Sequence, residues 1–134
     1  MSTTEFTEAQ IALLTQLTRD VCRRLFGSTD WIDVKSLTVQ SLESIGKVVD
    51  RLKADDIDNR DELNEDQLAD WRIQYQSKMV LTIYPPLAHL FNLIAVLAKG
   101  EIPNGDCLCG SKMEEINLWY MNRLRMDILG WDAL

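Results

Sequence analysis

The sequence predicts an all-α, single-domain bundle of four to five helices. Several segments repeat apolar residues every three to four positions, which is the spacing along one face of an α-helix. No segment of any length alternates apolar and polar residues with the period of a β-strand. With 134 residues, we expect one domain over residues 1–134 that buries about two thirds of its unfolded surface, enough for a core without disulfides.

The first helix is expected from Glu8 to Phe26. Thr7 and Gln10 have the spacing of a capping box, in which each side chain bonds the backbone N–H of the other residue. Gly27 is expected to end this helix in a left-handed conformation. The periodicity predicts a second helix over residues 37–53, which contains one glycine, Gly46. Because an interior glycine weakens a helix by about 1 kcal/mol relative to alanine, its presence favours a close helix–helix approach.

An acidic linker is expected over residues 54–66. Its acids form a candidate docking strip for a basic partner surface, and the plainer interpretation is a solvated connection between helices. The docking candidates are Asp55, Asp56, Asp58, Asp61 and Glu62. A calcium loop of the EF-hand type is not predicted, because from Asp56 its fifth and sixth positions are Arg60 and Asp61 rather than an oxygen ligand and glycine.

Residues 79–98 are apolar on nearly every side, and Pro85-Pro86 interrupts them. A helix of this kind has to be covered on most of its faces, by the centre of a bundle or by another protein. A third helix, capped by Asn64 and Gln67, is expected to stop or kink before the prolines. Pro86 then fits the first turn of a fourth helix that ends at Gly100. The prolines predict either a tight corner or a kink, and they argue against a membrane span.

The last helix is expected from Ser111 to about Leu129, after a Gly/Pro/Cys loop over residues 100–110. Its aromatic and methionine side chains suit either the closing of the bundle or an interface, since both bury large side chains. Tyr120 also falls on the apolar stripe of this helix. The candidate anchors for a partner are Trp119, Tyr120, Arg123 and Trp131.

Cys107, Cys109 and His89 are weak candidates for a metal or redox site. Zinc sites use two cysteine pairs, or one pair with two histidines, and this chain has one histidine and one close pair. Ordinary loop cysteines are the plainer interpretation. The sequence has no glycine-rich phosphate loop and no nucleophile elbow. We therefore expect a protein that is not an enzyme and that has no cofactor.

The formal net charge is −7, which disfavours direct binding to nucleic acid or to an anionic membrane. Three cysteines do not make a disulfide framework, which indicates a reducing, cytoplasmic location. The expected function is a protein–protein interaction or assembly module, with another protein or a second copy as partner. The alternative is a small acidic regulator or inhibitor that occupies a basic, nucleic-acid-binding surface of a larger complex, as in proteins of phages or mobile elements.

Overall fold

The computed structural model describes residues 5–27, 29–30, 32–55, 62–100 and 111–131, and it confirms the predicted all-α bundle. The described residues form five α-helices and one π-helical turn, with no strand among them. The elements are α1 (Glu8–Phe26), α2 (Val34–Asp55), α3 (Glu65–Thr82), α4 (Tyr84–Lys99), α5 (Ser111–Arg123) and the π-helical turn η3 (Leu124–Ile128).

Local capping explains several of the helix ends. The bounds of α1 are those predicted: the Thr7–Gln10 capping box is formed, and Gly27 has a φ of 81°, the left-handed conformation that glycine adopts without strain. The second predicted capping box, between Asn64 and Gln67, is also formed, with distances of 2.9 and 3.1 Å. The start of α2 was predicted too late. The Asp33 carboxylate accepts a bond from the Ser36 N–H at 3.1 Å, and this cap lets the helix begin at Val34.

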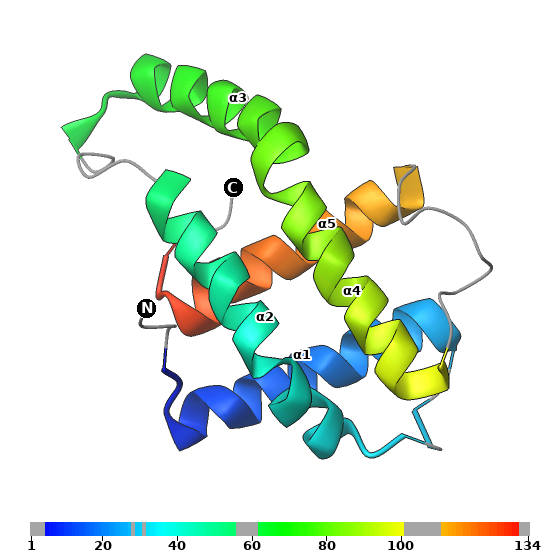
Figure 1. The fold of residues 1–134 in the computed structure, drawn as a ribbon. Helices are drawn as coiled ribbons and strands as arrows, with labels where there is room; N and C mark the ends of the chain where they lie inside the picture. Colours follow the sequence, from blue (N-terminus) through cyan, green and yellow to red (C-terminus); the bar gives the residue numbers. More distant parts are fainter. Residues whose placement is uncertain (1–4, 28, 31, 56–61, 101–110, 132–134) are drawn as a thin grey trace.

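Four helices enclose the core. α2 packs between α1 and α4, and α5 contacts both α1 and α4. Figure 1 shows α2 and α4 side by side, with α5 passing behind α4. Fully buried side chains from all four helices meet in this core, among them Leu14, Val49, Phe91 and Tyr120. The helix α3 packs mainly on α4, and its first turns extend from the top of the bundle in Figure 1.

At the two prolines the chain passes from α3 into α4 through a kink rather than a loop. α3 ends at Thr82 and α4 begins at Tyr84, so only Ile83 separates them. Ile83 keeps helical dihedral angles, with φ −101° and ψ −42°, and its side chain is fully buried. Pro85 and Pro86 lack the N–H groups that would continue the hydrogen bonding of α3. Of the two predicted alternatives, the structure has the kink (Figure 1).

The last helix ends in a form that the sequence did not predict. Instead of continuing as one α-helix, α5 passes into η3, where the Leu129 N–H donates to the Leu124 carbonyl at 3.1 Å. Such five-residue spacing widens the turn. Arg125, in the middle of η3, is only 1% exposed.

Candidate interaction surfaces

Tyr120, one of the four predicted anchors, lies in the core. Its exposed fraction is 0%, and its ring meets the Phe91 ring edge-on with centroids 5.1 Å apart. Burial raises the pKa of the Tyr120 hydroxyl above its ordinary value. A partner therefore cannot contact Tyr120 while the core remains closed.

The other three predicted anchors reach the surface. Trp119 is half-buried, and the Arg24 guanidinium lies 4.1 Å from the centre of its ring, a cation–π distance. Arg123 is exposed and pairs with Asp127 one turn along, at 2.7 Å. Trp131 is half-buried, with its ring 5.1 Å from the Arg125 guanidinium. These contacts tie each anchor to neighbours within the molecule.

The predicted acidic strip is described only at its edges. Asp55 is the last residue of α2, and Glu62 is exposed just before α3. Asp56, Asp58 and Asp61 lie outside the described residues. Further exposed acids follow in the first turns of α3, namely Glu65, Asp66 and Asp70.

The sulfur and imidazole candidates are not brought together in the part of the chain that the structure describes. Cys107 and Cys109 lie outside it, and His89 is exposed on α4. Within the described ranges no three His, Cys, Asp or Glu side chains are close enough to hold a metal ion. Cys22 is buried in α1, and burial raises the pKa of its thiol to about 11. Since the thiolate is the nucleophilic form, Cys22 is unreactive at neutral pH.

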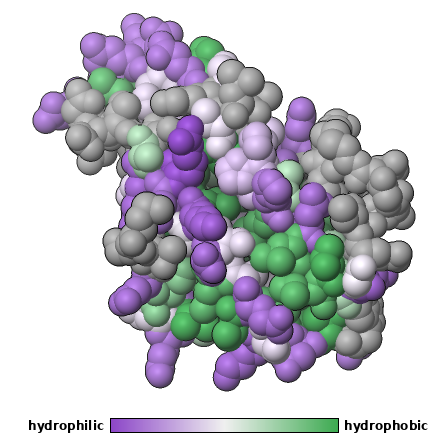
Figure 2. Space-filling view, in the orientation of Figure 1, coloured by the Kyte–Doolittle hydropathy of each residue, from purple (hydrophilic) through white to green (hydrophobic). Residues whose placement is uncertain are grey.

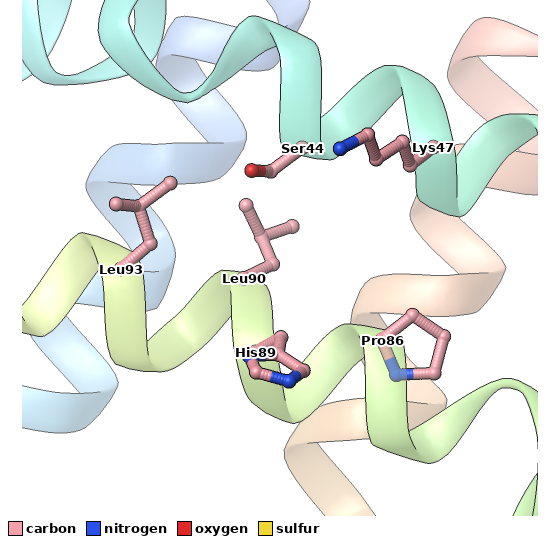
Figure 3. A pocket seen from close by; sticks show the side chains of 6 residues that line it. All are labelled: Ser44, Lys47, Pro86, His89, Leu90 and Leu93. Atoms are coloured by element: carbon pink, nitrogen blue, oxygen red, sulfur yellow. The ribbon is translucent and has the colours of Figure 1, made fainter.

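A groove of about 450 Å³ runs between α2 and α4. We call it the α2–α4 groove. Figure 3 shows Leu90 and Leu93 pointing from α4 toward α2, where Ser44 and Lys47 face them. Pro86 and His89 complete its lining on α4. Lys47 is exposed and lies 3.7 Å from Glu43, so the α2 side is polar and the α4 side is largely apolar.

Apolar surface continues along α4 beyond this groove. Val96 and Leu97 follow Leu93 by three and four residues, which places them on the same side of the helix. Their exposed fractions are 46% and 39%. Figure 2 shows hydrophobic surface over α4 on the same side. The opposite side of α4 is buried in the core. An all-round apolar helix was predicted to lie at the centre of a bundle or to present a surface to another protein, and α4 is both central and apolar on its exposed side.

The location of this surface was not predicted, because periodicity cannot divide a helix that is apolar on every side into an inner and an outer face. A usable signal was nevertheless present. Pro86, His89 and Leu93 recur at intervals of three and four residues, and His89 is a polar side chain within that apolar run.

No helix among the described residues is both long enough and apolar enough to span a bilayer. Comparison of the chain with protein-family models, curated proteins and solved structures finds no match.

Proposed function

We propose that this chain is a non-catalytic protein–protein interaction module that receives an amphipathic helix of a partner protein in the α2–α4 groove. The observation that carries the proposal is the exposed apolar side of α4. Single exposed apolar residues are common on protein surfaces. Leu93, Val96 and Leu97 instead continue the lining of one groove, and contiguous apolar surface of this kind is typical of a binding face.

The shape of the groove suits this mode of binding. A helix bound in a groove inserts side chains at intervals of three and four residues into an apolar channel. The floor of this channel is Leu90, which is 1% exposed, and Lys47 and His89 stand at its polar rim. Burying apolar area in such a contact contributes about 25 cal/mol per Å² before the costs of association.

The C-terminal surface remains a second location for the same function. Trp119, Arg123 and Trp131 are each accessible at least in part, and interfaces are enriched in tryptophan and arginine. With Tyr120 buried, that surface offers one large aromatic anchor fewer than the sequence predicts.

An acidic regulator is the other candidate function. What favours it is the row of exposed acids at the start of α3, together with the net charge of −7. In this case, binding to a basic partner should weaken steeply with added salt, because exposed charges are screened over about 10 Å at 0.1 M salt. Binding through the α2–α4 groove should depend little on salt.

A site-specific crosslink tests the groove proposal. A photo-crosslinking amino acid replaces His89 at the rim, and in a matched control it replaces Arg72, an exposed position on α3. The tagged chain is irradiated in cells of its source organism, and crosslinked proteins are identified by mass spectrometry. We expect one product that depends on position 89 and that Leu97→Asp abolishes. Products that are the same from both positions, or that survive Leu97→Asp, would contradict the proposal.

A further inference from the structure

A second groove, of about 740 Å³, lies where the start of α2 crosses α1. We call it the α1–α2 groove. Its apolar lining includes Ile11, Ala12 and Val39, and its cations are Arg19 and Lys35. Val39 is 52% exposed, which is high for a side chain of this kind. Figure 2 shows hydrophobic surface near this crossing.

The two cations of this groove have no partner of opposite charge within the described part of the chain. Neither Arg19 nor Lys35 forms an ion pair there. The Arg19 Nε is buried and has no hydrogen-bond acceptor. Arg19 as a whole is partly exposed, so a carboxylate from outside the chain can reach the rest of its guanidinium and offset its charge.

The outer face of α3 has the complementary chemistry. Asp66, Asp70, Ile73 and Ser77 are spaced by three or four residues, which places them on one side of the helix, and all four are exposed. Ile73 is 64% exposed, more than any other large apolar side chain described. Neither Asp66 nor Asp70 forms an ion pair among the described residues. This face therefore offers two free carboxylates beside one apolar side chain.

We infer that the chain associates with itself, the outer face of α3 in one copy lying in the α1–α2 groove of the next. This inference rests on the proposed interaction function and names a second copy as one partner, at a different surface. Charge decides the orientation. An antiparallel arrangement of α3 on α1 brings Asp66 and Asp70 to the Arg19 end of the groove and away from Glu8 at its other end. Ile73 then lies over Ile11 and Ala12.

The two surfaces also match in length. Along α1, the groove extends from Glu8 to Arg19, and the outer face of α3 extends from Asp66 to Ser77. Both segments contain twelve residues, and their eleven steps correspond to about 16 Å of helix at 1.5 Å per residue. One helix of each copy therefore covers the other over its whole contact face.

The contact is head-to-tail. α3 lies at the top of the molecule in Figure 1, and α1 lies at the bottom. A contact between two different surfaces of this kind repeats from copy to copy and gives chains or rings, unlike the closed dimer of a self-complementary surface. The attraction between its acidic and basic side chains also makes it sensitive to salt.

Sedimentation of two variants, separately and mixed, tests this inference. Ile73→Asp places a charge on the apolar part of the α3 face and leaves the groove unchanged. Val39→Asp places a charge in the groove and leaves the α3 face unchanged. Both side chains are more than half exposed, so each variant should fold, which circular dichroism checks. We expect the natural chain to form species that grow with concentration, each variant alone to be monomeric, and their equimolar mixture to give a 1:1 heterodimer.

A monomeric natural chain at near-millimolar concentration would overturn the inference. A closed dimer that survives Ile73→Asp would overturn it too, as would a mixture of the variants that stays monomeric. Met126→Asp is the matched control, because Met126 is an exposed apolar residue outside both surfaces, and this substitution should change nothing. The proposed function is tested separately, since Leu97→Asp should abolish the partner crosslink and leave self-association intact.

Discussion

The buried hydroxyl of Tyr120 is a weak point of the core. Its oxygen has no hydrogen-bond partner, although the ring packs fully against neighbours such as Phe91. A buried polar group without a partner costs about 1–3 kcal/mol of desolvation. Tyr120→Phe keeps the ring and removes that oxygen, so we expect the free energy of unfolding to rise by about 1 kcal/mol. Urea denaturation measures it, and a clear loss of stability would contradict this account of the hydroxyl.

Alkaline pH should destabilise the fold through two buried acids. Burial raises the pKa of Cys22 from 9.0 to about 11, and it raises that of Tyr120 from its ordinary value of 10.0. Both groups hold their protons more tightly when folded, so their contribution is complete below pH 9 and is lost as pH rises above it. We expect the free energy of unfolding to fall by at most ~1.4 kcal/mol per pH unit from Cys22 between pH 9 and 11, and further from Tyr120 above pH 10.

Denaturation curves between pH 7 and 11 measure this effect. The matched control is the double variant Cys22→Ala, Tyr120→Phe, in which both titrations are absent. If the natural chain and the double variant lost stability equally steeply, the buried acids would not be responsible.

Tyr120 also shows what sequence could and could not say about single residues. Its position on the apolar stripe of the last helix is typical of a buried residue, but its aromatic character led to its prediction as an interface anchor, and the structure buries it. Periodicity was the better guide, because the stripe reports the direction of the side chain and residue type does not. For Trp119 and Trp131, periodicity could not predict whether the side chain is buried or exposed. Both are partly buried, and each contacts a cation, Arg24 of α1 for Trp119 and Arg125 of η3 for Trp131.

At the scale of the element, Trp131 closes the π-helical turn. Its backbone N–H donates to the Arg125 carbonyl at 2.7 Å. The Arg125 guanidinium lies 5.1 Å from the centre of the Trp131 ring and 5.5 Å from that of the Tyr75 ring. We expect Trp131→Ala to lower the free energy of unfolding by about 2 kcal/mol, because it removes a packed ring and opens a buried cation to water. Trp131→Phe, which retains a ring, should lose less.

Thermal unfolding of both variants decides the role of Trp131. An alanine variant that is as stable as the natural chain but fails to bind a partner would show instead that Trp131 is an interface anchor, as the sequence suggested.

The elements that could be predicted are those whose ends are set locally. Capping boxes and left-handed glycines depend only on residues a few positions apart, so they can be recognised from the sequence. Examples are the boxes at Thr7 and Asn64 and the glycines at 27, 100 and 130. The kink at Pro85-Pro86 was predicted as one of two alternatives, because proline removes hydrogen bonds but does not fix the resulting angle. The π-helical turn was missed, since no local capping or breaking signal in the sequence marks residues 124–128, and the buried Arg125 within it is positioned by tertiary packing.

For the whole molecule, the fold class followed from periodicity, but the surfaces did not. α4 is apolar around its circumference, and the positions of α2, α3 and α5 determine which sides are covered. α3 presents the opposite difficulty: Trp71 and Tyr75 face inward while Ile73 faces outward, so its apolar residues do not form one stripe. Both proposed surfaces depend on these helices, which explains why the sequence alone directed attention to the C-terminal helix.

Amide hydrogen exchange would test this arrangement over the whole molecule. In dilute solution we expect the amides of α1 and α4 to exchange slowly, because these helices line the core, and the first turns of α3 to exchange fastest among the helices, because that end extends from the bundle. If copies associate head-to-tail, raising the concentration should protect two separate segments, Asp66–Ser77 and Glu8–Arg19. Ile73→Asp should cancel both changes together, since the two segments face each other across one contact. If only one of the two segments became protected, the head-to-tail contact would be contradicted. The peripheral position of α3 would still hold, because it rests on the exchange rates in dilute solution.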